Sequence, residues 1–434
     1  MESKYTKQKK NKKNLSLPWN SCRMKIIGIV LFMFFWSLTQ ISAQNIATNY
    51  DSITIDSTNF NQYFNLAKDL KNKFLYKKAF RITEKLCRFD SVNVDLLILK
   101  GDMYDDINAS KKAIQYYDKA LAVDTFNLSA LLKLGNLYMM LKDYTTAMGY
   151  FFPVLNYIDS LNYFALKQIG YSYLSMGDQV AVFGFPYLVK AYDVNPYDLS
   201  LIIQIGNFLN KSRKFDETLL YCDRGLQYDS LNSKILNLKG YTLYNKNDYP
   251  AAIGCFEKVL QQEDTSAFTL QNLGYAYYRD GQMMKARKLL ELSLVFDTAE
   301  YEPYIILGDI YLQQKQPDKS LKYFNKADSL KYPPSITQTT IYRGMSDAFT
   351  QKRDWDDAVF YLTRACETKP KDMSLLFRLG NYYEYMKLNE KAYQAYSQVI
   401  SSNDTANYRQ EINASAIRLK RLNEELFFDG KKQK

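Results

Sequence analysis

The stretch that decides the fold is LGYAYYRDGQMMKARKLLELSL, residues 273–294, in which apolar side chains recur at helical spacing. Gly274 stands inside the first of the two predicted helices, where glycine costs about 1 kcal/mol relative to alanine. The chain has Gly240 in a similar context thirty-four residues earlier and Gly308 thirty-four residues later. Three glycines in one register indicate a repeat.

A small residue returns at about this interval along most of the chain. The series is Ala67, Gly101, Gly135, Gly170, Gly206, Gly240, Gly274, Gly308, Ser346 and Gly380. We therefore divide the chain into ten repeats, which begin near residues 60, 94, 128, 163, 199, 233, 267, 301, 339 and 373. Each repeat is predicted to contain two amphipathic helices joined by a turn.

The second helix of a repeat carries a small residue and, four residues later, a large one, as in Ala147 and Phe151. A glycine on the first helix would let such a helix pair approach closely, and we expect the burial gained there to outweigh the cost of glycine. One pair of helices cannot cover its own apolar faces, so neighbouring repeats must stack into a continuous core.

This pattern resembles the tetratricopeptide repeat family over residues 60–406. The resemblance implies an all-α fold: an α-solenoid wound as a right-handed superhelix of about ten helix-turn-helix units. Residues 407–434 are predicted to form a C-terminal capping helix and a basic tail. The resemblance also implies that the first helices line a concave groove, which in this family generally binds peptides or proteins.

Two features depart from the regular pattern. Pro153 lies within the second helix of the third repeat and should bend it, and Gly184 and Pro186 interrupt the second helix of the fourth. The second irregularity is either a bulge that exposes Phe183 or Phe185 to a partner, or simple decay of the repeat. Residues 331–334 lengthen the connection before the ninth repeat and are predicted to be a loop.

The positive charge is concentrated at the N-terminus. The net charge is +11, but residues 1–25 carry eight basic residues against one acidic residue, so they supply +7 and the rest only +4. We therefore expect no nucleic-acid partner.

An apolar segment follows this basic stretch. Residues 26–43 contain an apolar core that ends before the small residues Ser42 and Ala43, as is typical of a secretory signal peptide. Cleavage near Ala43 would leave residues 44–59 as a linker and place the protein in the periplasm or cell envelope, as an exported bacterial protein. An uncleaved signal anchor in the inner membrane is the alternative, and Met24 is a possible alternative start.

The residue type that most often serves as a catalytic base is missing. The chain has no histidine, and its cysteines lack the short paired spacing of a zinc site. We therefore expect no enzymatic activity, no cofactor and no metal. The cysteines that follow the apolar segment are predicted to be buried free thiols: Cys87, Cys222, Cys255 and Cys366.

The family geometry places certain positions of each first helix in the concave groove. In the sixth and seventh repeats they hold aromatic, amide and cationic side chains suited to an extended peptide: Tyr241, Tyr244, Tyr275, Tyr278, Lys234, Asn237, Phe268, Gln271, Asn272 and Arg279. With 38 tyrosines in the chain, these rings could instead pack between first helices. The second repeat offers an acidic patch of Asp102, Asp105 and Asp106.

The leading functional hypothesis is an exported, non-catalytic scaffold that binds a protein or peptide partner in this groove. A carbohydrate-binding or peptidoglycan-binding module is one alternative, because tyrosine rings also stack on sugars. A membrane-anchored periplasmic sensor or assembly component is another. The sequence leaves the partner and the oligomeric state open.

Overall fold

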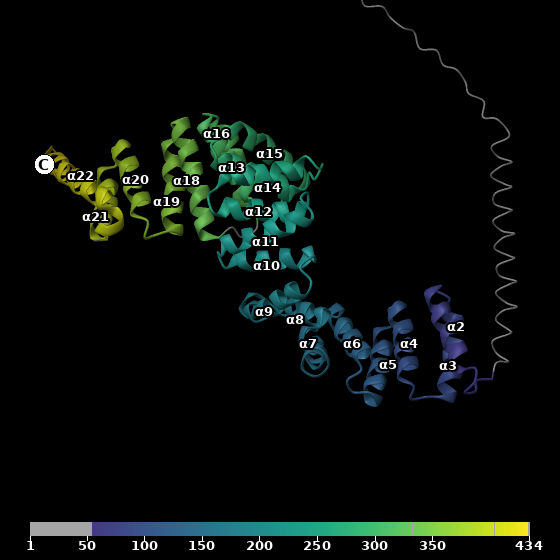
Figure 1. Ribbon diagram of the computed structural model, residues 1–434. Coiled ribbons are helices and arrows are strands. Elements are labelled where there is room, and N and C mark those ends of the chain that lie inside the picture. The colour runs from purple at the N-terminus through teal and green to yellow at the C-terminus, as the bar shows by residue number, and fades with distance from the viewer. Residues whose placement is uncertain (1–53, 331–333, 403, 433–434) are drawn as a thin grey trace, which may run out of the picture. The chain divides into compact units, whose positions relative to one another are not determined.

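The computed structural model describes residues 54–330, 334–402 and 404–432. Over these residues the chain forms 21 α-helices and one π-helical segment, with no strand (Figure 1). The helices group into two compact bodies, an N-terminal body up to Val194 and a C-terminal body from Asn195. The predicted all-α solenoid is confirmed. The basic N-terminal segment, the predicted signal peptide and most of the predicted linker lie outside the described residues, as does the end of the basic tail.

The N-terminal body contains four helix pairs. They are α2 (Phe60–Asn72), α3 (Tyr76–Phe89), α4 (Val94–Asp106), α5 (Ser110–Val123), α6 (Leu128–Met140), α7 (Tyr144–Pro153) with the π-helical η1 (Val154–Ile158), α8 (Tyr163–Ser175) and α9 (Asp178–Val194).

The C-terminal body contains six further pairs and a last helix. They are α10 (Leu199–Lys211), α11 (Phe215–Tyr228), α12 (Ser233–Asn245), α13 (Tyr249–Leu260), α14 (Ala267–Arg279), α15 (Met283–Phe296), α16 (Glu302–Gln313), α17 (Pro317–Ser329), α18 (Ser335–Lys352), α19 (Trp355–Thr368), α20 (Met373–Tyr385), α21 (Asn389–Ser401) and α22 (Thr405–Lys432).

Most of the repeated glycines lie where the two helices of a repeat touch; Gly206 instead lies closest to Leu238 of α12 in the next repeat. A methyl group added at Gly135 would stand 2.5 Å from the ring of Phe151, which is sixteen residues later on the second helix. The same offset joins Gly274 to Leu290, at 2.7 Å, and four other pairs: Gly101 with Tyr117, Gly240 with Phe256, Gly308 with Phe324 and Gly380 with Tyr396. Because a real Cβ does not approach this closely, glycine is the residue that lets these helices pack.

In the ninth repeat a serine, Ser346, occupies the position of the repeated glycine. Ser346 is buried and donates a hydrogen bond from its Oγ to the carbonyl oxygen of Ala358 on the second helix, at 2.7 Å. The sequence-based assignment of Ser346 to the small position is therefore confirmed. Gly344, two residues earlier, faces the preceding repeat instead, because a Cβ there would overlap the ring of Phe324.

The connections between repeats carry a capping motif that the sequence analysis missed. The sequence Asp-Ser/Thr-x-Asn recurs at residues 90–93, 124–127, 159–162 and 229–232. In the third of these, Asn162 Oδ1 accepts the amide of Ala165 at 3.1 Å, and Asn162 Nδ2 donates to Asp159 Oδ2 at 3.4 Å. Asp159 Oδ1 also accepts the amide of Leu161. Each loop thus caps the helix that follows it using its own side chains.

A left-handed residue ends the first helix of every repeat. The positions are Phe74, Asn108, Lys142, Gly177, Arg213, Asn247, Gly281, Lys315, Arg353 and Lys387, all with positive φ. Such a residue lets the chain turn sharply into the second helix.

Replacing Lys142 with glycine should stabilise the N-terminal body by about 1 kcal/mol, because an L-residue in the left-handed region is strained. Lys142 is exposed and has φ 62°, so the change removes no core contact. Asn108, with φ 57°, is the control, since asparagine tolerates this conformation and Asn108→Gly should gain less. Denaturant unfolding of both variants checks this prediction, and an equal gain at both sites would contradict it.

The two predicted irregularities take different forms. After Pro153 the chain continues as the π-helical η1, in which the amide of Asp159 bonds to the carbonyl of Val154 five residues earlier. By contrast, α9 runs unbroken through Gly184 and Pro186, and a Cβ on Gly184 would stand 2.8 Å from the carbonyl oxygen of Gly170. Gly184 therefore allows close packing of α8 and α9.

Of the two aromatic residues expected at that site, Phe183 is exposed and Phe185 is half-buried. Their surroundings are a continuous helix and not a bulge.

The predicted start of the ninth repeat is wrong by one helical turn. Pro334, with ψ 153°, is the N-cap of α18, which begins at Ser335 and not near residue 339. The extra residues therefore lengthen the helix, because nothing after Pro334 breaks it before the left-handed Arg353. Residues 331–333 of the predicted loop lie outside the described residues.

The last helix covers the end of the stack, as expected. Arg418 Nη1 on α22 lies 2.6 Å from Glu384 Oε2 on α20, and Arg421 pairs with the same carboxylate. Leu422 is fully buried and packs with Tyr396 of α21. The predicted capping helix is thus confirmed by both apolar and charged contacts.

Candidate functional site

A pocket of about 300 Å³ opens along the first helices of the C-terminal body. Its walls come from α12, α14, α16 and α18, with one residue from α17. The residues that line it are Tyr244, Tyr278, Arg279, Ile305, Ile306, Asp309, Leu312, Phe324, Thr340, Arg343, Gly344 and Asp347. Three of the predicted groove residues, Tyr244, Tyr278 and Arg279, therefore lie together.

The two tyrosines of this pocket are half-buried and also pack between helices. The hydroxyl of Tyr278 donates to Asp309 Oδ2 at 2.5 Å, which joins α14 to α16. The ring of Tyr244 lies 5.6 Å from that of Tyr249, measured between centroids, and burial raises the pKa of Tyr244. Each ring thus serves both as pocket wall and as packing between helices.

Other predicted groove residues stand on α12 and α14 outside this pocket. Tyr241 and Phe268 have 41% and 52% of their surface exposed, and Lys234 is also exposed. Tyr275 is half-buried, and burial raises the pKa of its hydroxyl, with a further contribution from Glu302. The predicted aromatic floor is therefore divided into an exposed part and a recessed part.

The predicted amides are largely engaged within the chain. Asn237 Nδ2 donates to Thr269 Oγ1 at 3.2 Å, and Asn272 Nδ2 donates to the carbonyl of Phe268 at 2.8 Å. Gln271 differs, because it is only 8% exposed and its Nε2 has no hydrogen-bond partner among the described residues. A buried amide without a partner is costly, and this nitrogen is closed to solvent, so a ligand on the surface does not reach it.

The sequence analysis missed all of the pocket residues that come from the eighth and ninth repeats; those that decide its charge and shape are Asp309, Arg343, Gly344 and Asp347. Asp347 forms an ion pair with Arg378 of α20, whose guanidinium also donates to the hydroxyl of Tyr382. The available signal was the charge at groove positions in these two repeats, together with Gly344, an additional glycine close to the small position.

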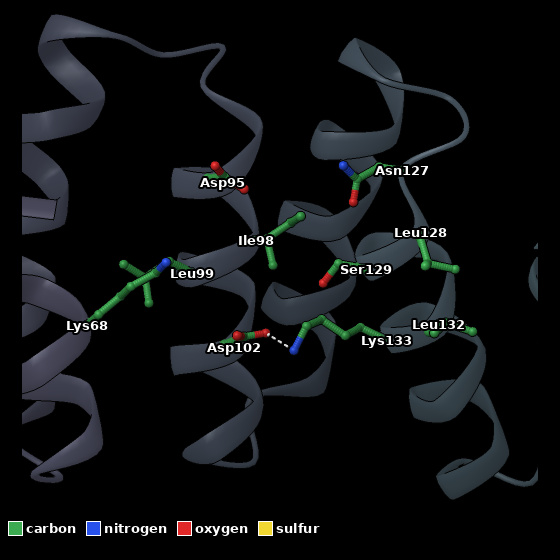
Figure 2. A pocket seen from close by; sticks show the side chains of 10 residues that line it. All are labelled: Lys68, Asp95, Ile98, Leu99, Asp102, Asn127, Leu128, Ser129, Leu132 and Lys133. Atoms are coloured by element: carbon green, nitrogen blue, oxygen red, sulfur yellow. Dashed lines mark ion pairs between the residues drawn. The ribbon is translucent and has the colours of Figure 1, made fainter. Parts of the chain in front are cut away.

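A wider hollow of about 630 Å³ lies along the first helices of the N-terminal body (Figure 2). Figure 2 shows Lys133 of α6 pointing toward Asp102 of α4, and their charged atoms lie 2.8 Å apart. Asp102 also accepts a hydrogen bond from the hydroxyl of Tyr117. Lys68 on α2 stands at one side of the hollow.

The acidic patch predicted in the second repeat is mostly neutralised by the chain itself. Besides the pair at Asp102, Asp106 lies 3.2 Å from Lys71 Nζ. Asp105 has a raised pKa because of burial and the neighbouring carboxylates Asp106 and Asp102. The patch is therefore a poor partner for basic side chains.

The four cysteines expected as free thiols are free. Cys222 and Cys255 are buried, whereas Cys87 and Cys366 are half-buried. Burial raises the pKa of Cys222 to about 12 and that of Cys366 to about 11, so both are protonated at neutral pH.

No helix in the described part of the chain is both long enough and apolar enough to span a membrane. The apolar segment at residues 26–43 is not among these residues.

Comparison with known proteins identifies repeats of one family. Tetratricopeptide repeat models match residues 94–127, 129–151 and 301–332. The chain is 21% identical over 367 residues to a TPR repeat-containing protein of Methanocaldococcus jannaschii, covering 78% of this chain and 62% of that protein. It is 22% identical to the anaphase-promoting complex subunit CDC16 of Saccharomyces cerevisiae over 67% of this chain and 37% of that subunit. The chain thus spans less than two thirds of either relative.

Among solved structures, the chain is similar to YrrB, described as a TPR protein with an unusual peptide-binding site. The match has 20% identity and a TM-score of 0.38, and it covers 44% of this chain and 95% of that one. Together with the helix pairs and their glycine contacts, the family-model matches show that this chain contains tetratricopeptide repeats.

Proposed function

We propose that the chain is a non-catalytic scaffold that binds an extended peptide of a partner protein along α12, α14, α16 and α18. The observation that carries this proposal is the pocket of about 300 Å³, to which four successive first helices contribute. Its apolar floor with aromatic and charged walls is the usual composition of a specific binding site.

The surface beside the pocket supports an extended ligand. Tyr241 and Phe268 expose rings on α12 and α14, one on each of two successive first helices. Rigid rings bind a peptide at a low cost in side-chain entropy. The ligand would thus run from these residues into the pocket.

Binding is tested with an array of 15-residue peptides of random sequence. Phe268→Ala should weaken the selected peptides about tenfold, since an exposed anchor ring is worth more than 1 kcal/mol in an interface. Phe360 is a matched control, because it is 54% exposed but lies on the second helix α19. Equal losses in both variants, or no loss in either, would refute binding on the first helices.

We propose the cell envelope as the location, on the grounds of the signal-like segment at residues 26–43. The mass of the mature protein tests this. A chain that begins at Gln44 is expected, whereas a chain that retains these residues would support the anchored sensor or assembly component.

A carbohydrate-binding role is the second candidate, and one observation favours it. The ring centroids of Trp355 and Tyr385 lie 4.1 Å apart, Tyr385 is 65% exposed, and both line a hollow that also includes Arg353 and Asp354. Aromatic faces beside polar groups can hold a sugar ring. Binding on a glycan array that is lost in Tyr385→Ala but kept in Phe268→Ala would establish this role instead.

A further inference from the structure

The charges in the pocket of the C-terminal body do not balance. Arg279 and Arg343 line it together with the carboxylates Asp309 and Asp347. Asp347 is already neutralised by Arg378, which lies outside the lining. Three guanidinium groups therefore stand against two carboxylates, so the site carries one excess positive charge.

The remaining carboxylate is also occupied. Asp309 Oδ2 accepts hydrogen bonds from the hydroxyl of Tyr278 at 2.5 Å and from Nε2 of Gln313 at 2.6 Å. A ligand cation would have to compete with both donors, and Asp347 is committed to Arg378. The pocket is therefore poorly suited to a basic side chain.

The two arginines, in contrast, have capacity for a ligand. Arg343 is exposed and forms no ion pair within the part of the chain that the structure describes. Arg279 lies over the ring of Tyr249, 5.3 Å from its centroid, a contact that steadies the guanidinium without neutralising it. Guanidinium groups pair strongly with carboxylates, often through two parallel hydrogen bonds.

The shape of the recess also fits an acidic side chain. The ring of Phe324 packs against Gly344 and is almost fully buried, so the apolar surface within a ligand's reach comes mainly from the half-buried Ile305 and Ile306. A ligand side chain could place its methylene groups against these residues and its charged end near the arginines.

We propose that this pocket receives the side chain of a glutamate or aspartate in the partner peptide, with its carboxylate held by Arg279 and Arg343. This inference rests on the proposed function, since it names the chemistry of one residue in the bound peptide. The structure thus assigns an acidic recognition motif to the partner.

The test uses the full chain and 15-residue peptides of random sequence that are acetylated at the N-terminus and amidated at the C-terminus. Their only carboxylates are those of side chains. The peptides selected should share a glutamate or aspartate at one position, and its replacement by glutamine or asparagine should weaken binding at least tenfold.

Arg343→Gln should lower the affinity for the selected peptide by about the same factor. Combining Arg343→Gln with the loss of the acidic residue from the peptide should lower the affinity little further, because both changes remove the same contact. Arg409→Gln is the matched control, since Arg409 is an exposed arginine of the same body, on α22, outside the pocket. Because Arg343 is exposed, its variant should melt at the temperature of the parent protein.

The possible results distinguish failure of the acidic motif from failure of the proposed peptide binding. Peptides that bind, and weaken with Phe268→Ala, but tolerate both the loss of their acidic residue and Arg343→Gln would overturn the acidic motif alone. A carboxylate could also come from the C-terminus of the peptide, so a parallel set of peptides is made with free C-termini. If only this set binds, the proposed acidic side-chain motif is wrong. No binding by any peptide would overturn both proposals.

Discussion

Replacing Phe324 with alanine is expected to lower the free energy of unfolding of the C-terminal body by about 3–5 kcal/mol. Its ring is only 2% exposed and fills the space between Gly308 of α16 and Gly344 of α18. Neither glycine has a side chain that could move into the vacated volume, so the cavity would remain. Denaturant unfolding followed by circular dichroism measures the loss.

Phe360→Ala is the control for this prediction as well. Phe360 is 54% exposed on α19, so its removal should change the free energy of unfolding by no more than about 0.5 kcal/mol. If Phe324→Ala cost no more than Phe360→Ala, the ring would not be the wedge between these two repeats.

Alanine is expected to have opposite effects at two glycines of the third repeat. At Gly135 a Cβ would stand 2.5 Å from Phe151, so Gly135→Ala should destabilise the N-terminal body by about 1–3 kcal/mol. At Gly149, inside α7, no atom lies within 4 Å of the added Cβ. Gly149→Ala should therefore stabilise the body by about 0.5–1 kcal/mol, because alanine is the better helix former. Thermal and denaturant unfolding of both variants decide the signs.

A second substitution checks the cause of the loss at Gly135. Phe151→Leu should restore part of the stability when combined with Gly135→Ala, because the smaller side chain makes room for the methyl group. A stabilising effect of alanine at both glycines would show that the repeated glycine has no packing role.

Much of the fold could be predicted because a single steric requirement recurs. A residue such as Gly274 is unfavourable in a helix, so its return at a fixed interval had to reflect a contact, and the partner sixteen residues later shows which contact. Ser346 could be assigned to the same position because its hydroxyl is small and finds a carbonyl acceptor on the facing helix.

The site was harder to predict because it depends on contacts between repeats. The register alone does not show that Tyr278 reaches Asp309, or that Arg378 occupies Asp347. Those contacts decide which charges remain available to a ligand. The start of α18 was also hard to predict. The residues after Pro334 could belong to the helix or to a loop, and the spacing between repeats is compatible with both.

The self-contained capping loops bear on how such a chain can lengthen over time. In the loop at residues 229–232, the side chain of Asn232 bonds to Asp229 and to the amide of Ile235, so this turn finds its side-chain partners within the loop and the helix that follows it. A gene segment copied from loop to loop would bring its own helix start with it. Duplication and loss of whole repeats would then leave no unsatisfied backbone group at the junction, and evolution could adjust the number of repeats without redesigning the turns between them.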